Sequence, residues 1–369
     1  MTPAAEPPRT ATADLALVRR FPAIHRGLRR HALCTLPTPV APLEHLARAR
    51  GLGPLWIKRD DVSSPLYGGN KPRKLEWLLG AALARGRRAV MTFGGIGTHH
   101  GLATAICAHD AGLRTVLVLL PQPVTAHVRH CLLLHHAFGC EMHLAESVPG
   151  VAMTALRRLG QGLRAGEPLA IIPTGGTSAL GAIGYVNAAC ELADQVRAGL
   201  LPEPAAIFVP VGSGGTVAGL LLGLRLAGLR STVVGVMVTD ILPPSPRRLA
   251  GLARGAFRRL RRVAPSLPAT PIRPQDVVIE RAYLGPGYGA VTEAGETAQR
   301  LLADTEGIPL ETTYTAKTMA AMLDLAARPP YRDQPSLFWN TYSSIDPGAG
   351  LATLPDWREL PPAFHRFFV

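Results

Sequence analysis

The chain of 369 residues has little of several features that would direct it to a specialised class of protein. Its five cysteines are odd in number, widely spaced and form no Cys-x-x-Cys pair, which fits reduced thiols and predicts no disulfides. No apolar stretch approaches the roughly 20 residues of a membrane-spanning helix, because the longest, residues 217–224, ends at Arg225. The first dozen residues also lack the apolar core of a secretory signal. We therefore expect a cytoplasmic protein without a membrane segment, with a partly disordered tail within residues 1–30.

Aromatic residues and lysines are also scarce. Aromatic residues make up 5% of the chain, which argues against a protein that stacks nucleic-acid bases, despite the net charge of +13. Only Lys58, Lys71, Lys74 and Lys317 are lysines among 39 basic residues. Where arginine fills nearly every ordinary basic position, each lysine becomes a candidate for a site that needs a deprotonatable amine or a compact ammonium.

Residues 247–262 hold the densest basic run, with seven arginines. Leu249, Leu252, Ala256 and Leu260 recur within it at helical spacing. This pattern predicts an amphipathic surface helix with a solvated basic face, and an anionic partner or a membrane surface is the alternative.

The remainder of the chain predicts an α/β protein. Its length exceeds the usual single core, so one large α/β unit or two lobes that share a cleft are expected, and 47% hydrophobic residues suffice to build a core. Strands are expected at 55–59, 89–93, 115–120, 141–144, 169–172, 205–211 and 232–238. Helices are expected between them, at 71–86, 100–111, 125–137, 151–164, 179–198 and 216–227. This alternation is typical of open, mostly parallel sheets, whose ligands bind at the carboxyl ends of the strands.

A glycine-rich loop, Gly212-Ser213-Gly214-Gly215-Thr216, lies at such a strand end and opens a helix. Its glycines let several backbone N–H groups point at one spot, and the helix start adds a positive dipole end. The loop therefore suits a phosphate, although it lacks the spacing of a nucleotide or dinucleotide fingerprint. Close packing of helix on strand is the alternative explanation.

The segment Gly68-Gly69-Asn70-Lys71 places a lysine at the start of another helix. Arg73, Lys74 and the positive helix end should lower the pKa of the Lys71 amine and favour a nucleophile, as Schiff-base chemistry requires. An ordinary solvated basic turn is the alternative.

Several ordered motifs together resemble the D-cysteine desulfhydrase and 1-aminocyclopropane-1-carboxylate deaminase family. The motifs are 55–61, 68–76, 92–100, 172–177, 184–186, 212–216, 285–289 and 314–317, and the resemblance spans residues 37–327. It implies pyridoxal 5'-phosphate, the two-lobed fold of the tryptophan synthase β chain, a small amino-acid substrate and a homodimer. The smaller lobe would comprise residues 62–168, and residues 1–61 with 169–369 would form the larger one.

The resemblance also assigns roles. Lys71 would hold the cofactor and move the substrate's Cα proton, with Asn70 beside it, and Gly212, Ser213, Gly214, Gly215 and Thr216 would bind the cofactor phosphate. Tyr288 and Tyr314 would contact substrate or cofactor. Thr315 would face the pyridine nitrogen where the deaminases carry a glutamate. Because a hydroxyl cannot balance a protonated ring, elimination of a good leaving group such as thiolate is favoured over ring opening.

Two segments depart from the family pattern. Thr98-His99-His100 stands where the family has Ser-Asn-His. Thr98 would then meet the substrate and His99 would lie near the cofactor's 3-oxygen, while His100 matches. We expect His99 to titrate near neutral pH; a packing or helix-capping role is the alternative. Tyr342 and Ser343 replace a glycine pair of the family, which predicts an altered substrate range or loss of the standard activity.

The sequence thus predicts a pyridoxal-phosphate-dependent lyase that performs D-cysteine desulfhydrase-like α,β-elimination to a keto acid and ammonia. Deaminase, racemase and β-replacement activities are alternatives. A protein of another class, which holds the cofactor without turnover, is a further one. The histidines and cysteines at 127–143 match no zinc-binding spacing, so no metal site is expected.

Overall fold

The computed structural model describes residues 8–241 and 243–369 of the chain and has two sheets. The larger sheet has the order β1-β2-β10-β7-β8-β9 and is parallel except for the pair β1–β2. Its strands are β1 (Val40–Pro42), β2 (Leu55–Lys58), β7 (Ala206–Val211), β8 (Thr232–Met237), β9 (Val278–Glu280) and β10 (Ser336–Trp339). The smaller sheet is fully parallel, in the order β5-β4-β3-β6. Its strands are β3 (Ala89–Gly95), β4 (Arg114–Leu120), β5 (Glu141–Leu144) and β6 (Leu169–Ile171).

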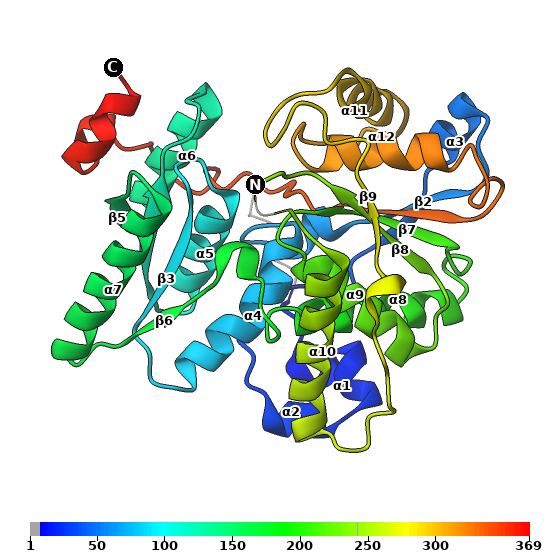
Figure 1. Cartoon of the computed structure of the whole chain (residues 1–369), viewed down its shortest axis with the longest axis horizontal. Coiled ribbons are helices and arrows are strands. Elements are labelled where there is room, and N and C mark those ends of the chain that lie inside the picture. Colours follow the sequence, from blue (N-terminus) through cyan, green and yellow to red (C-terminus); the bar gives the residue numbers. More distant parts are fainter. Residues whose placement is uncertain (1–7, 242) are drawn as a thin grey trace, which may run out of the picture.

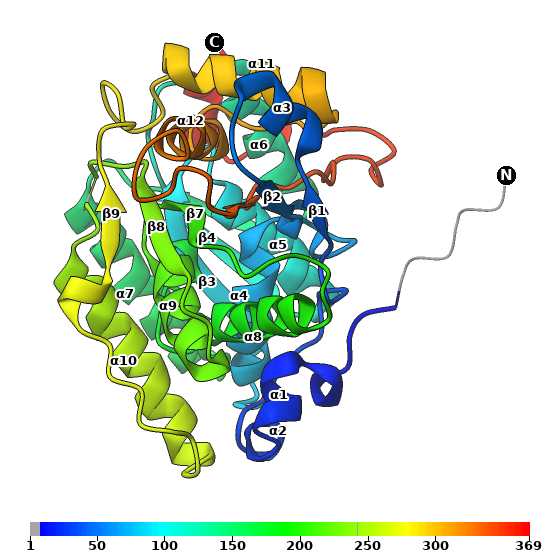
Figure 2. The same cartoon turned by 90° about the vertical axis from the view of Figure 1, so that its right-hand side faces the viewer.

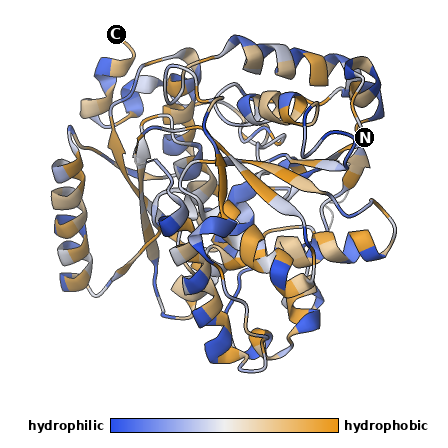
Figure 3. Ribbon diagram, turned by 45° about the vertical axis from the view of Figure 1, so that its right-hand side comes forward, coloured by the Kyte–Doolittle hydropathy of each residue, from blue (hydrophilic) through white to orange (hydrophobic). Residues whose placement is uncertain are grey.

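Both faces of the larger sheet are buried, because successive side chains along each strand point to opposite faces. Ile207, Val209 and Val211 of β7 join the core that contains α8 (Ile183–Arg197), α9 (Gly215–Ala227) and α10 (Pro246–Val263). Ala206 and Phe208 point the other way, into the core with α3 (Glu44–Arg50), α11 (Glu293–Glu306) and α12 (Thr315–Leu325). Figure 2 shows these helix groups on opposite sides of the sheet, and Figure 3 shows its strands largely in the colour of apolar residues.

The smaller sheet is covered in the same manner. α5 (His99–Asp110) and α6 (Ala126–Ala137) lie on one face and α7 (Val148–Arg164) on the other. α4 (Asn70–Leu83) lies between the two lobes and packs against both α5 and α8 (Figure 1). The two-lobed, open, mostly parallel α/β architecture is therefore confirmed.

Two boundaries differ from the prediction. β6, which was assigned to the larger lobe after residue 168, pairs with β3 in the smaller sheet. The C-terminal segment with the 3₁₀ helices Trp357–Glu359 and Pro362–Phe367 packs its apolar side chains against α6 and the smaller sheet. Chain order alone does not show this, because the segment crosses back after β10.

The N-terminal region is more ordered than predicted. The expectation for residues 1–7 lies outside the described residues. Beyond them, a 3₁₀ turn (Thr12–Asp14), α1 (Ala16–Arg20) and α2 (Ala23–Gly27) form, and Leu15, Leu17 and Ile24 enter the core beside α8. Three further 3₁₀ turns span Asp60–Val62, Thr174–Gly176 and Pro274–Asp276. No helix of the described chain is both long and apolar enough to cross a membrane.

The arginine-rich segment forms α10, as predicted. Leu249, Ala253, Ala256 and Leu260 are buried on one face of this helix, and most of its arginines remain exposed. Each of the five cysteines is a buried free thiol.

Candidate active site

Lys71 lies in the first turn of α4, where the chain makes a glycine turn against another segment. Gly69 has φ +81, and a Cβ there would lie 2.5 Å from the carbonyl oxygen of Thr341. The N–H of Asn70 donates to that carbonyl (3.2 Å), and the N–H of Gly68 donates to Ser343 Oγ (2.9 Å). The segment after β10, including the atypical Ser343, therefore holds the turn that presents Lys71.

Burial is the main influence on the pKa of the Lys71 amine. Its Nζ donates to Asn70 Oδ1 (2.7 Å). Desolvation lowers the pKa of the amine to about 8, and the Glu311 carboxylate opposes this. The predicted direction is confirmed, but burial is the main cause and Arg73 is not. Arg73 points away into a buried ion network with Asp60 and Glu191.

The loop Gly212–Thr216 follows β7 and leads into α9. Gly214 has φ +92, a conformation that favours glycine, and a Cβ on it would lie 2.3 Å from Leu249 Cδ2 of α10 and would have to displace that side chain. No side chain caps the start of α9 in the described chain, which leaves its first N–H groups directed outward. Asn70 Nδ2 donates to Thr216 Oγ1 (3.2 Å), which joins this loop to the Lys71 turn.

Lys74 lies on the other side of the loop. Its Nζ donates to the carbonyl of Gly175 (3.2 Å) and would lie 3.4 Å from a Cβ on Gly215. Thr177 Oγ1 and Ser213 Oγ are hydrogen-bonded at 2.6 Å beside it. Burial, followed by the charge of Lys71, lowers the pKa of the Lys74 amine. Sequence reasoning missed Thr177 and did not assign Lys74 to the loop, although the scarcity of lysine pointed to it.

The loop region thus offers uncapped N–H groups, the Lys74 amine, two hydroxyls and glycines free of side chains. Together they form a cradle that fits a phosphate dianion. Lys71, which is linked to this cradle through Asn70, has an amine suited to an aldehyde. These residues fit pyridoxal phosphate.

Tyr288 and Tyr314 meet as a pair. Their hydroxyls are 2.9 Å apart and their rings pack edge to face. Tyr314 also lies beside the phosphate loop, since a Cβ on Gly212 would be 3.6 Å from Tyr314 Cε1. The structure therefore brings both predicted tyrosines to one side of the loop.

Glu311 is a site residue that sequence reasoning missed. Its carboxylate accepts hydrogen bonds from the N–H groups of Thr313 (2.8 Å), Tyr314 (2.8 Å) and Thr315 (2.6 Å) at the start of α12. It also accepts one from Thr315 Oγ1 (3.1 Å). Desolvation raises the pKa of Glu311 against these hydrogen bonds. A carboxylate just before a helix was the available signal. Thr315 is buried, as a cofactor-facing residue would be, and a carboxylate lies one hydrogen bond behind it.

The start of α5 carries the histidine segment. Thr98 is the N-cap and its Oγ1 accepts from the N–H of Gly101 (3.2 Å). His100 is buried, with Nε2 3.0 Å from Thr92 Oγ1. The capping role that we considered for His99 belongs to Thr98.

The His99 ring lies among other rings. Its Nδ1 is 2.9 Å from the Tyr67 hydroxyl, its Nε2 is 2.9 Å from His127 Nε2, and it meets Tyr342 edge-on. Desolvation, and then the charges of His127 and Lys71, lower the pKa of His99 to about 3. The expectation that His99 titrates near neutral pH is therefore wrong, and its imidazole is neutral there. Tyr342, the other departure from the family pattern, lies next to it.

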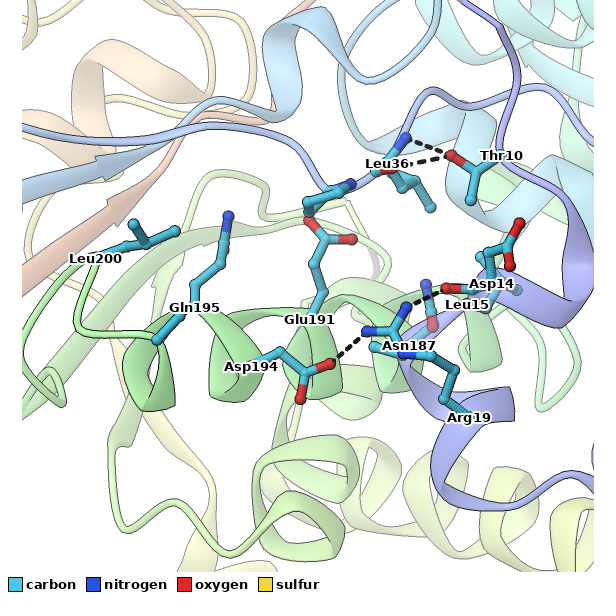
Figure 4. Close-up of a pocket in the computed structure, with 13 residues that line it drawn as sticks. Thr10, Asp14, Leu15, Arg19, Leu36, Asn187, Glu191, Asp194, Gln195 and Leu200 are labelled. Carbon is cyan, nitrogen blue, oxygen red and sulfur yellow. Dashed lines mark hydrogen bonds and ion pairs between the residues drawn. The ribbon is translucent and has the colours of Figure 1, made fainter.

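A cavity of about 310 Å³ lies elsewhere, between the N-terminal segment and α8 (Figure 4). Glu191, Asp194 and Gln195 line it from α8, and Asp14 and Arg19 from the opposite side. It contains none of the predicted site residues. Glu191 is already paired with Lys58 and Arg73, so this cavity borders a structural ion network.

The fold and this site define a class of enzyme. The model of the family described as "Pyridoxal-phosphate dependent enzyme" matches residues 32–341, and the chain belongs to that family. Within it, the chain falls in the D-cysteine desulfhydrase and 1-aminocyclopropane-1-carboxylate deaminase group. The predicted recognition, the enzyme class and the cofactor are thereby confirmed.

Three relatives illustrate the similarity. A D-cysteine desulfhydrase of Klebsiella pneumoniae (strain 342) is 33% identical over 89% of this chain and 96% of its own length. A nocardicin C-9' epimerase of Nocardia uniformis subsp. tsuyamanensis is 35% identical over 89% of this chain and 97% of its own length. A crystal structure described as an ACC deaminase homologue superposes with a TM-score of 0.72 at 29% identity, and covers 90% of this chain and 95% of its own.

Proposed function

We propose that this enzyme catalyses α,β-elimination on a small amino acid with a good leaving group at Cβ, with D-cysteine as the first candidate. The products would be a keto acid, ammonia and sulfide. One observation carries the proposal: the Lys71 amine has a pKa of about 8 and lies beside a phosphate cradle. A base with a pKa near the working pH is effective in removing a Cα proton.

Different residues of the chain would bind the cofactor, move the proton and bind the substrate. Lys74, Ser213, Thr216 and the start of α9 would hold the cofactor phosphate, and Lys71 would carry the cofactor and then take the Cα proton. Pyridoxal phosphate, when bound, supplies the electron sink for the Cα electrons. The hydroxyls of Tyr288 and Tyr314, which are hydrogen-bonded to each other, would donate a hydrogen bond to substrate.

Thr315 supports elimination over cyclopropane ring opening, because its neutral hydroxyl would meet the pyridine nitrogen. Glu311 brings a negative charge close to Thr315. Its carboxylate already accepts from the Thr315 hydroxyl, so negative charge reaches the ring side of the site only through that hydrogen bond. The sink would therefore be weaker than with a carboxylate in direct contact.

A second candidate is epimerisation at an amino-acid centre. The 35% identity to a nocardicin C-9' epimerase favours it. It needs a proton donor besides Lys71, which the Tyr288–Tyr314 pair would supply.

One experiment separates these activities. The purified enzyme with pyridoxal phosphate is given D-cysteine, L-cysteine or 1-aminocyclopropane-1-carboxylate in D₂O, and sulfide, keto acid, chirality and Cα deuteration are followed. We expect keto acid and sulfide in equal amounts from D-cysteine and none from the cyclopropane. Cα deuteration with inversion and no keto acid would establish epimerisation instead. Absence of both turnover and exchange with D-cysteine would refute the elimination proposal.

The atypical residues offer a test of specificity. We expect His99→Asn combined with Tyr342→Gly to raise kcat/KM for D-cysteine, because these changes restore the family pattern next to the cofactor. His136→Asn on α6 lies outside the site and serves as the matched control. A decrease with the restored residues would show that His99 and Tyr342 are adapted to a different substrate.

We also propose that the enzyme is a cytoplasmic homodimer, as the family resemblance suggests. Light scattering of the purified protein tests the dimer, and fractionation of the producing cells tests the location.

A further inference from the structure

Three side chains of the kinds that bind transition metals converge at the start of α5. His99 is the first residue of α5, and His127 and Cys131 lie one turn apart on the same face of α6. His127 Nε2 is 2.9 Å from His99 Nε2 and 3.5 Å from Cys131 Sγ. All three ligand atoms lie within 4.8 Å of one another.

We propose that His99, His127 and Cys131 form a binding site for a zinc-type divalent cation. This goes beyond the proposed function and does not rest on it, since the three contacts involve neither Lys71 nor the loop Gly212–Thr216. Two ligands at i and i+4 of one helix, with a third from a neighbouring element, are typical of such sites.

The ligand atoms lie near the separations that the ion requires, and small side-chain movements would complete the fit. Zinc bonds of about 2.0–2.1 Å to nitrogen and about 2.3 Å to sulfur put neighbouring tetrahedral ligands roughly 3.3–3.6 Å apart. The Cys131–His127 pair already has this separation. The His99–Cys131 pair, which lies within 4.8 Å, has to close by up to roughly 1.2 Å, and the two histidine nitrogens need to part by roughly half an ångström. His127 is exposed and can make that movement, and it also gives an ion access from solvent.

A second observation orients the ligands. The Tyr67 hydroxyl lies 2.9 Å from His99 Nδ1, so Nδ1–H can donate to it and leave the Nε2 lone pair for the ion. Tyr67 is itself buried, which fixes that partner in place. Such an outer partner on the second ring nitrogen is the usual companion of a metal-binding histidine.

Hydrogen bonds alone do not satisfy all the polar atoms of this cluster. His127 Nε2 has either one proton or one lone pair, yet it faces both His99 Nε2 and Cys131 Sγ. A cation would take a lone pair from each of the three atoms. On binding, the Cys131 thiol would release its proton to solvent, no electron would be transferred, and water would complete the tetrahedron.

The spacing of histidines and cysteines within residues 127–143 did not predict this site. Sequence reasoning searched that segment for a complete ligand set, whereas the third ligand comes from His99, 28 residues before His127. His99 also meets Tyr342 beside the cofactor site, so an ion here would fix that ring.

Cobalt binding tests the proposal. Tag-free holoenzyme is treated with chelator, dialysed and titrated with Co²⁺, and its near-ultraviolet and visible spectra are compared with those of His127→Ala, Cys131→Ser and the matched control His136→Ala. We expect one Co²⁺ per chain with a thiolate-to-cobalt band, displaced by Zn²⁺, in the wild-type and His136→Ala enzymes. Affinity should fall at least tenfold in the other two variants and about tenfold or more in Tyr67→Phe.

Binding that persists unchanged in both His127→Ala and Cys131→Ser, or cobalt that binds without the thiolate band, would overturn the proposal. So would a lack of binding by the wild-type enzyme at micromolar Co²⁺ or Zn²⁺. Because His127 is exposed, His127→Ala should retain its circular dichroism spectrum, which separates loss of a ligand from loss of the fold.

Discussion

The loop Gly212–Thr216, which we propose to hold the cofactor phosphate, gives the sharpest quantitative prediction, because α9 has a left-handed glycine at each end. Gly214 precedes the helix with φ +92 and Gly228 ends it with φ +81. An alanine at either position costs roughly 1–2 kcal/mol for the left-handed conformation. Around Gly228 no atom lies within 4 Å of a new Cβ, whereas at Gly214 the Cβ would lie 2.3 Å from Leu249 Cδ2. Gly214→Ala therefore adds an overpacking cost of up to about 1–3 kcal/mol, because either the Leu249 side chain or the loop has to shift to make room.

The assay has two parts, urea unfolding of the cofactor-free protein and titration with pyridoxal phosphate followed by absorbance. We expect Gly228→Ala to lower the free energy of unfolding by about 1–2 kcal/mol and to leave cofactor affinity unchanged. Gly214→Ala should be less stable by a further 1–3 kcal/mol or so and should bind the cofactor at least about tenfold more weakly, which corresponds to about 1.4 kcal/mol. Equal cofactor affinities in the two variants would refute the assignment of this loop to the phosphate.

Three other predictions concern charged groups. The rate at which cofactor-free enzyme takes up pyridoxal phosphate should rise with pH through about 8, because only the neutral Lys71 amine attacks an aldehyde; stopped-flow absorbance checks this. Since the Glu311 carboxylate raises the pKa of Lys71, Glu311→Gln should move that rise to lower pH while Glu311→Asp moves it less, and an unchanged midpoint would exclude the coupling. Arg73→Ala should lower the free energy of unfolding by about 3–5 kcal/mol in urea, because it leaves buried Asp60 and Glu191 without their shared partner; a loss below about 1 kcal/mol would contradict the network.

Much of the fold follows from the sequence, for identifiable reasons. The core strands and helices between residues 55 and 238 lie within a few residues of their predicted bounds, because apolar runs and glycine stops recur in regular alternation. α1, α2, α11 and α12 were not predicted. α1 and α2 are too short to show helical periodicity, and their stability comes from packing on the core.

The sequence predicted the parts of the candidate site whose residues lie within one segment with a distinctive composition. The glycine content of the turn before Lys71 and of the loop before α9 is enough to predict both segments from the sequence. His127 contacts His99 of another segment, so only the fold reveals it, whereas Glu311 lies four residues before Thr315 and had a signal in its place just before a helix. The side-chain direction of Arg73 was equally invisible, because its partners Asp60 and Glu191 are brought to it by β2 and α8.

The central claim is that Lys71 holds the cofactor, and the visible spectrum of the purified protein before and after borohydride tests it most directly. We expect a yellow wild-type protein whose visible band disappears on reduction, with the reduced cofactor found by mass spectrometry on the peptide that contains Lys71. Lys71→Ala should show no such adduct, whereas Lys317→Ala should retain it. A wild-type protein that stays colourless with added pyridoxal phosphate, or an adduct on another lysine, would contradict the account.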